Sequence, residues 1–209
     1  MLVVEDLQFG FRHRPLIRNL SFSLNPGQLM HLQGPNGCGK TTLLNLLTGL
    51  YQPGGGRIRL LDGEQELDPP RHREYLASES NGLYGKLDAM TNLRFWSSLR
   101  GRYPDEQALI GELAAWKLDH PLVRSGFPVE RFSTGMKRRL ALARLNLSGT
   151  RLWLLDEPLN GLDPGGISAF EQGLRRHLDH QGMAIMVSHD ASVFRNFAPV
   201  ELSPNGETS

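Results

Sequence analysis

The sequence predicts an α/β fold in which a parallel sheet carries helices on both faces and a helical segment is inserted. A glycine-rich loop at 34–41 lies between an apolar stretch and a helical pattern. Residues 90–118 hold two successive amphipathic helical patterns. In the second half of the chain, apolar strands alternate with helices, which is the pattern of a parallel sheet. We therefore expect a single domain over 1–209 that contains a helical subdomain over 85–132.

The first part of the chain carries strand patterns and one helix. Strands are predicted over 2–9, 22–33 and 54–63. The second of these ranges should be a pair of strands that turns at Asn25-Pro26-Gly27, because these three residue types favour turns. Residues 39–50 have helical periodicity, and we expect this helix to end at Gly49.

The rest of the chain is mostly helical around two strongly apolar strands. Residues 151–158 and 182–189 are nearly continuous apolar runs, as is typical of central strands buried on both faces. The predicted helices are 90–102, 104–118, 133–147, 166–180 and 190–197. Pro104-Asp105 is a typical helix start, and Ser133 is a candidate N-cap.

Composition narrows the classes of function. The chain has 209 residues with 39% apolar and 22% charged residues, which suits an ordinary globular core. A formal net charge of +1 gives no general attraction to nucleic acid or to anionic membranes. Cys38 is the single cysteine, so it excludes an internal disulfide and fits a reducing compartment. We expect no signal peptide, because the N-terminal stretch lacks a long apolar core and includes the acidic Glu5 and Asp6. We expect no direct membrane insertion, because no run approaches about 18 apolar residues.

The loop at 34–41 matches the pattern G-x-x-x-x-G-K-[ST], which predicts a nucleotide phosphate site. Its glycines let consecutive N–H groups point at phosphate oxygens, and the helix that follows adds its positive N-terminal end. Lys40 should reach the β- and γ-phosphates of ATP, and the Thr41 hydroxyl should ligate Mg²⁺. A plain glycine turn before a helix is the alternative. The candidate nucleotide-binding residues here are Gly34, Pro35, Asn36, Gly37, Cys38, Gly39, Lys40, Thr41 and Thr42.

Polar side chains follow both apolar strands at their carboxyl ends. Asp156 and Glu157 are adjacent carboxylates, which are costly at the end of a buried strand unless a cation awaits them. We expect Asp156 to order the Mg²⁺ shell and Glu157 to polarise an attacking water. His189 should lie at the same edge of the sheet and contact the γ-phosphate. The alternatives are a strand-end cap or ion pair for the carboxylates, and a surface histidine.

With these motifs in place, the chain resembles the ATP-binding cassette (ABC) ATPases over residues 2–202. The segment RFSTGMKRRLALAR resembles the family's signature sequence, although Thr134 and Met136 depart from its usual L-S-G-G-Q. NGLD at 160–163 resembles the segment at the family's dimer seam. The resemblance implies a P-loop NTPase fold with a mixed β-sheet flanked by helices, an antiparallel β-subdomain and a small helical insertion. It also implies an ATPase of the translocase type.

The family resemblance further implies partners and contacts between chains. Ser133 and Gly135 would complete the phosphate site of a second cassette in a head-to-tail homodimer. Phe11 resembles the aromatic residue that stacks on adenine, with Phe9 as the alternative and core packing as the other reading of both. Residues 137–139 are three consecutive cations, which we interpret as a solvated helix face and not as a nucleic-acid site.

One position departs from the family pattern. A glutamine that touches Mg²⁺ is usual between the core and the helical insertion, whereas YLASESNGLYGKLDAMTNL contains none. Aligning on Gly82-Leu83-Tyr84 places Glu79 at the metal, and a slip of one residue places Ser80 there. Because Glu79 would add negative charge near the γ-phosphate, Glu79→Gln is expected to raise basal turnover.

The transported substrate would be chosen by a membrane subunit. LALARLNLSGTRLWLLDEPLNGLD and DAMTNLRFWSSL resemble the haem-export ATPases of bacterial cytochrome c maturation. Drug or polysaccharide exporters, a nucleotide-dependent scaffold and a soluble cassette acting on ribosomes or DNA are the alternatives. We expect a cytoplasmic protein, peripheral on the cytoplasmic face of the inner membrane. An integral-membrane subunit should dock near 79–96, where Tyr84, Phe95 and Trp96 form either its apolar floor or a small core of the insertion.

Overall fold

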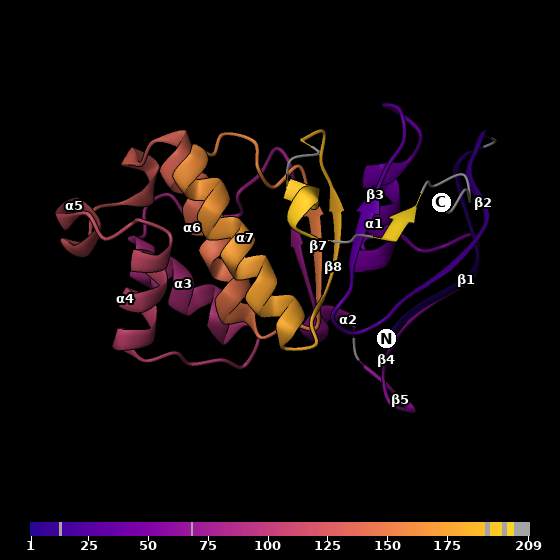
Figure 1. The fold of residues 1–209 in the computed structure, drawn as a ribbon, viewed down its shortest axis with the longest axis horizontal. Coiled ribbons are helices and arrows are strands. Elements are labelled where there is room, and N and C mark those ends of the chain that lie inside the picture. The colour runs from indigo at the N-terminus through magenta and orange to yellow at the C-terminus, as the bar shows by residue number, and fades with distance from the viewer. Residues whose placement is uncertain (13, 68, 191–192, 198–199, 203–209) are drawn as a thin grey trace.

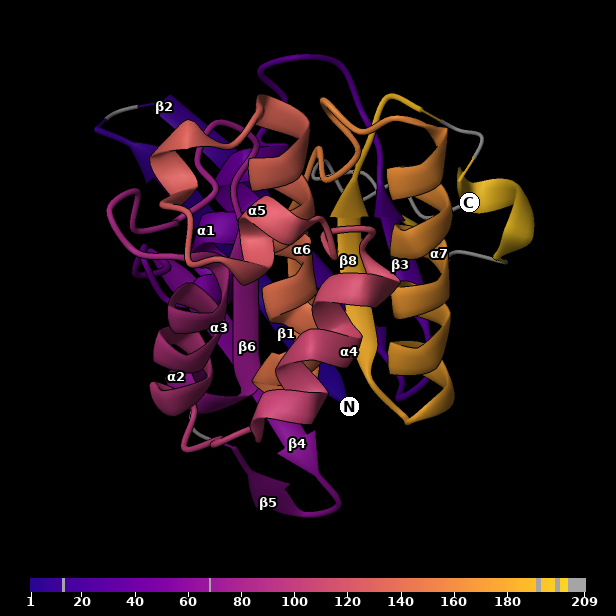
Figure 2. The same cartoon turned by 90° about the vertical axis from the view of Figure 1, so that its left-hand side faces the viewer.

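The computed structural model describes residues 1–12, 14–67, 69–190, 193–197 and 200–202. The elements lie in layers (Figure 1). An antiparallel sheet forms one side, α1 lies between it and a parallel sheet, and α6 and α7 cover the opposite face of the parallel sheet. The helices of residues 89–124 lie beyond α6, at the end of the molecule farthest from the antiparallel sheet (Figures 1 and 2).

The antiparallel sheet has the order β2-β1-β4-β5. Its strands are β1 (Leu2–Phe11), β2 (Arg14–Leu24), β4 (Gly55–Asp62) and β5 (Gln65–Glu66). The sequence prediction placed the start of the second strand at residue 22, eight residues too late. In residues 14–20 buried Ile17 and Leu20 alternate irregularly with exposed arginine and asparagine, so the strand signal there is weak.

The parallel sheet has the order β6-β7-β8-β3-β9, and every pairing in it is parallel. Its strands are β3 (Leu29–Leu32), β6 (Arg73–Leu76), β7 (Leu152–Asp156), β8 (Met183–Val187) and β9 (Val200–Leu202). The predicted strand pair over 22–33 is therefore divided between the two sheets. The sequence analysis missed β6 because Arg73 and Glu74, both buried, interrupt its apolar pattern.

The two apolar strands are buried on both faces, as their sequences predict. In β7, Leu152 and Leu154 point into a core shared with α1 and the antiparallel sheet, whereas Trp153 and Leu155 point into a core shared with α6 and α7. Residues of β8 alternate in the same way: Met183, Ile185 and Val187 on one side, Ala184 and Met186 on the other. The parallel sheet is thus a rigid partition between two hydrophobic cores.

The long helices form where their periodicity predicts. They are α1 (Lys40–Thr48), α3 (Ala89–Ser98), α4 (Glu106–Ala115), α6 (Thr134–Ser148) and α7 (Pro164–Asp179). Shorter helical segments are α2 (Pro69–His72), α5 (Pro121–Arg124), Val129–Arg131 and Val193–Asn196. Of the helix expected over 190–197, the structure shows the last of these segments, and residues 191–192 lie outside the described residues.

Helix ends follow the expected chemistry. Gly49 ends α1 with φ of 85°, and the Ser133 hydroxyl accepts from the Met136 N–H at 3.2 Å, so both predicted caps are confirmed. Asp88, Asp105 and Asp163 cap α3, α4 and α7 in the same way as Ser133 caps α6. Within the described part of the chain, no helix combines the length and apolarity needed to cross a bilayer.

Candidate nucleotide site

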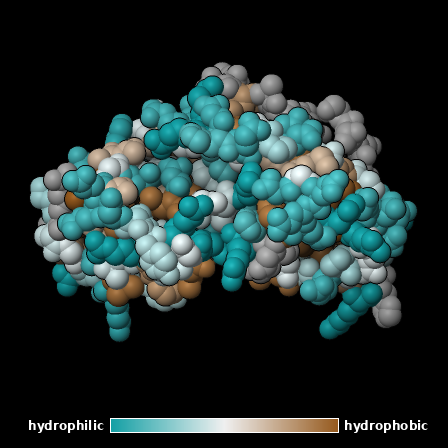
Figure 3. Space-filling model, turned by 90° about the horizontal axis from the view of Figure 1, so that it is seen from below, coloured by the Kyte–Doolittle hydropathy of each residue, from teal (hydrophilic) through white to brown (hydrophobic). Residues whose placement is uncertain are grey.

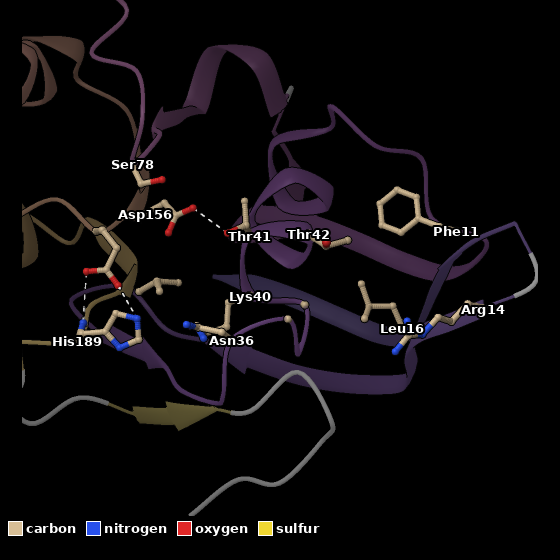
Figure 4. A pocket seen from close by; sticks show the side chains of 14 residues that line it. Phe11, Arg14, Leu16, Asn36, Lys40, Thr41, Thr42, Ser78, Asp156 and His189 are labelled. Atoms are coloured by element: carbon tan, nitrogen blue, oxygen red, sulfur yellow. Dashed lines mark hydrogen bonds and ion pairs between the residues drawn. The ribbon is translucent and has the colours of Figure 1, made fainter. Parts of the chain in front are cut away.

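The topology brings the predicted site residues to one edge of the parallel sheet. Strands β3, β8 and β7 are neighbours, and their carboxyl ends lead to the glycine loop, to His189 and to Glu157. These segments border a cleft of about 620 Å³ (Figure 4). The predicted residues that line it are Phe11, Asn36, Gly37, Gly39, Lys40, Thr41, Thr42, Asp156, Glu157 and His189.

The glycine loop presents the start of α1 to the cleft. Gly39 precedes the helix with φ of 108°, makes no side-chain cap, and is followed by no acidic residue in the first turn. A side chain at Gly37 would meet no atom within 4 Å, so this stretch of backbone is open to a ligand. Lys40 lies across the loop, and its Nζ donates to the carbonyl oxygens of Gly34 at 2.6 Å and Pro35 at 3.1 Å. The arrangement fits an anion, because uncapped N–H groups and a cation meet there.

Thr41 and Asp156 are joined across the cleft edge. The Thr41 Oγ1 donates to Asp156 Oδ2 at 2.9 Å, and Asp156 is buried at the end of β7 (Figure 4). A hydroxyl and a carboxylate are hard oxygen ligands of the kind that Mg²⁺ prefers. No group of three His, Cys, Asp or Glu side chains suited to a metal occurs among the described residues. The donor set therefore fits a Mg²⁺ that takes its other ligands from phosphate and water.

Glu157 is held beside His189 in an unusual backbone conformation. Its φ of 47° lies in the left-handed region, which is strained for a residue with a side chain and is often found at functional sites. The Glu157 Oε2 accepts from the His189 N–H at 3.3 Å, and the His189 Nε2 lies 3.5 Å from Oε1. That Oε1 is buried and accepts no hydrogen bond from the described residues, so it has capacity left for a water.

Phe11 and Phe9 occupy different environments. Phe11 lies at the far end of the cleft from Asp156 and is 52% exposed (Figure 4). Phe9 packs against the core and stacks on Tyr51 at 5.5 Å between ring centres. Of the two aromatic candidates, Phe11 is therefore the one that a base in the cleft would meet.

Several cleft residues were missed by the sequence analysis. Arg14 and Leu16 line the cleft from β2, whose first half carries too weak a strand signal to be placed. Ser78 lines it from the linker after β6. Glu79 is exposed and does not line the cleft, and Ser80 instead accepts from the Gly82 N–H at 3.3 Å. The structure thus does not bring Glu79 to the Thr41–Asp156 pair, and the cleft lacks the additional negative charge that Glu79 was expected to place near the γ-phosphate.

The prediction of a solvated face at 137–139 is wrong for Arg138. This side chain is 3% exposed, and it donates to the carbonyl oxygens of Glu157 at 2.7 Å and Pro158 at 3.0 Å. Burial lowers the pKa of Arg138, against the opposing effect of Asp156. Helical spacing could have predicted this burial, because Arg138 lies three, four and seven residues before the buried Ala141, Leu142 and Leu145 and so shares their face of α6.

Ser133 and Gly135 lie outside the cleft. They begin α6, where Ser133 is exposed and no acidic residue occupies the first turn. A side chain at Gly135 would approach the Gly161 carbonyl at 3.2 Å, so the signature segment and the NGLD segment are neighbours. Within one chain, the structure does not join these residues to the glycine loop.

The sequence matches the ABC transporter family over residues 17–160. It is 37% identical to the cytochrome c biogenesis ATP-binding export protein CcmA 2 of Cupriavidus metallidurans, over 90% of this chain and 89% of that one. It is 38% identical to CcmA of Methylococcus capsulatus, over 91% of each chain. The chain belongs to the ABC transporter family.

Solved structures agree on the fold of this ABC protein. An ATP-binding subunit of an ABC transporter superimposes with a TM-score of 0.84 at 23% identity, covering 100% of this chain and 89% of that one. An ATP-binding cassette in its ADP conformation gives 0.76 at 19% identity, covering 97% and 86%. The predicted ABC ATPase fold is confirmed, and so is the prediction of an ATP-binding, ATP-hydrolysing subunit of an ABC transporter.

Proposed function

We propose that this ABC ATPase energises an export step of bacterial cytochrome c biogenesis, with haem as the cargo of a separate membrane subunit. One observation carries the proposal: relatives named cytochrome c biogenesis ATP-binding export proteins match about nine-tenths of this chain at 36–38% identity. A protein that shares both length and sequence with these relatives is expected to share their partner. Export of a drug or a polysaccharide is the alternative.

The cleft geometry supports a specific division of labour during hydrolysis. Lys40 and the start of α1 would hold the β- and γ-phosphates, with Phe11 against the base. A Mg²⁺ bound by Thr41 and Asp156 would neutralise phosphate charge. Glu157 would accept a proton from the attacking water, and His189 would orient the γ-phosphate.

A head-to-tail homodimer explains the two signature residues that lie outside the cleft. Ser133 and Gly135 begin α6, whose exposed start carries no acidic residue in its first turn and so suits the γ-phosphate of a second copy. ATPase activity per molecule should then rise with protein concentration, and Ser133→Arg should lower it in both sites. Activity per molecule that stays constant on dilution to the monomer, as measured by sedimentation, would contradict the dimer.

The membrane subunit is proposed to dock beside α3, on the cytoplasmic side of the inner membrane. A hollow of about 370 Å³ lies there, bordered by Thr48 and Leu50 of the core and by Trp96 and Arg100 of the helical region. Phe95 packs edge to face against both Tyr84 and Trp96 nearby, with Tyr84–Phe95 ring centres 4.8 Å apart. The surface seen in Figure 3 is largely hydrophilic with small separate apolar patches, so it offers no competing broad apolar face.

A complementation experiment tests the export role. In bacteria that lack this chain, the wild-type gene should restore c-type cytochromes that carry covalent haem, and Lys40→Ala should not. Arg151→Lys is the matched control, because Arg151 pairs with Asp62 away from the cleft. Normal holocytochrome levels in the strain that lacks the gene would contradict the haem role. Equal phosphate release by purified wild type and Glu157→Gln would instead favour a nucleotide-dependent scaffold.

A further inference from the structure

Arg138 joins two segments that are far apart in the sequence. On one side it binds the end of β7, donating from Nε to the Pro158 carbonyl at 3.0 Å and from Nη2 to those of Glu157 at 2.7 Å and Asp156 at 3.4 Å. On the other side its Nη1 donates to the Ala77 carbonyl at 3.0 Å and to Asn81 Oδ1 at 3.3 Å. The partners in the linker lie 57 to 61 residues before Arg138 in the sequence, and the partners at the strand end lie 18 to 20 residues after it.

This contact set suits an arginine and no other residue. A guanidinium has five N–H donors in a rigid plane, and Arg138 meets five acceptors. Four of them are backbone carbonyls, so the arginine fixes the course of the chain and does not merely neutralise a side chain. The bonded carbonyls of Glu157 and its two neighbours determine where the strained Glu157 backbone holds its carboxylate.

The same linker is also held by Arg144, six residues further along α6. Its Nη1 donates to the Asn81 carbonyl at 3.4 Å, and its guanidinium lies 4.4 Å from the centre of the Trp96 ring. A side chain at Gly82 would lie 2.9 Å from the Arg144 Nη1, so the linker passes the arginine closely. Trp96 and Gly82 both border the hollow beside α3. The linker thus lines this hollow with Ala77, Ser80 and Gly82, and it is tied to the strand end of Glu157 through the bonds of Arg138.

We propose that Arg138 is a positioning residue: its bonds hold the linker 77–82 and the backbone of Glu157 in one arrangement, and the rate of hydrolysis depends on that arrangement. The inference rests on the proposed function, because it assigns Glu157 to the attacking water. Arg138 does not touch the nucleotide: it does not line the cleft, and its donors are occupied by protein oxygens. Its effect is therefore expected on turnover and not on ATP affinity.

The first test separates positioning from binding and from stability. Arg138→Lys keeps the charge but concentrates its donors on one atom, which cannot hold both segments. In the full-length protein we expect kcat to fall about tenfold or more while the KM for ATP stays within about twofold. Asn81→Ala removes one acceptor of Arg138 in the linker without changing a residue of α6, and it should lower kcat about two- to fivefold. Arg151→Lys, at the opposite end of β7, is the control and should change neither.

The second test follows the coupling itself. Binding of a non-hydrolysable ATP analogue should change tryptophan emission, and Trp96→Phe should abolish that change. Arg138→Lys should bind the analogue with wild-type affinity but lose the emission change. If Arg138 only stabilised the fold, the folded variant would keep that emission change.

Each outcome decides the inference. An unchanged kcat in Arg138→Lys, a retained emission change, or no emission change in the wild type would overturn it. If Arg138→Lys does not fold, unchanged kcat and emission in Asn81→Ala overturn it, and lowered values support it. Wild-type turnover no higher than that of Glu157→Gln would refute the proposed function instead, so the two failures are distinguishable.

Discussion

The two edges of the parallel sheet each have a hollow lined in part by histidine, yet they differ in the ends of the helices that surround them. At the carboxyl edge, α1 begins beside Lys40 with open N–H groups. At the amino edge, a hollow of about 410 Å³ is lined by residues near the C-termini of α6 and α7, among them Asn146, Gly149 and His180. Helix N-termini attract anions and C-termini repel them. A phosphate site is therefore expected at the carboxyl edge alone.

His189 at the carboxyl edge and His177 at the amino edge differ in the same sense. His189 has a side chain that is 70% exposed and lies beside the partly unbonded carboxylate of Glu157. His177 stacks on Trp153 at 3.9 Å between ring centres and lies 2.9 Å from the Met183 carbonyl. The comparison predicts that changes at the carboxyl edge alter catalysis and that changes at the amino edge alter stability.

The largest expected effect is at Glu157. Glu157→Gln keeps the shape and the bond from the His189 N–H but removes the proton acceptor, so kcat should fall by about 10²–10⁴. Equilibrium binding of ATP and the melting temperature should stay close to wild type. The measurement is phosphate release at saturating ATP. A high wild-type rate that falls by less than tenfold in the variant would assign water activation to another group.

The pH dependence of folding tests the amino edge. Burial lowers the pKa of His177 to about 4, against the opposing effect of the Met183 carbonyl. Between about pH 6.5 and 4 the unfolded chain therefore binds a proton at His177 that the folded chain does not. The contribution of neutral His177 to the free energy of unfolding is present above pH 6.5 and is lost as the pH falls to about 4. The loss should reach about 3 kcal/mol in the free energy of unfolding, measured with urea at each pH.

His177→Phe is the matched variant for this measurement. Phenylalanine retains the stacking surface for Trp153 but cannot titrate, so its unfolding free energy should fall less steeply below pH 6.5 than that of the wild type. Parallel pH profiles for the two proteins would show that His177 is not the titrating group.

The sequence predicted most of the carboxyl edge because its chemistry is local. The glycine loop, Asp156-Glu157 and His189 each follow an apolar strand, and parallel topology then brings them together. The same reasoning located α1, α6 and α7 to within a few residues. Local patterns sufficed wherever one strand or helix end carries the function.

The missed features depend on contacts between distant segments. β6 pairs with β7 and can bury Glu74 because that carboxylate pairs with Arg100 at 2.8 Å and with Arg144 at 3.2 Å, and none of these pairings is visible in a local pattern. Arg138 looked like one cation in a charged run, although its partners lie at residues 77–81 and 156–158. Glu79 was placed at the metal by alignment alone, whereas the linker turns Ser78 toward the cleft. Tertiary partners decided each of these positions.

A smaller effect is expected at Gly182, where the amino edge is closely packed. A side chain at this position would overlap the imidazole of His177, which is held by Trp153 and cannot move freely. Gly182→Ala should lower the free energy of unfolding by about 1–3 kcal/mol. The kcat of the folded protein should not change. A loss of kcat without a loss of stability would contradict the division between the two edges.

The smallest expected effect is at the outer end of the cleft, where Phe11 and Phe9 form a matched pair on β1. Their rings touch edge to face at 5.1 Å, but only Phe11 borders the cleft. Stacking of an aromatic ring contributes about 0.5–1.5 kcal/mol, so Phe11→Leu should raise the KM for ATP about two- to twelvefold with little change in melting temperature. Phe9→Leu should instead lower the melting temperature with little change in the KM for ATP, because it loses the stack on Tyr51 and core packing but no ligand contact. Equal changes in KM for the two variants would mean that the base does not lie against Phe11, and the cleft would then hold the nucleotide by its phosphates alone.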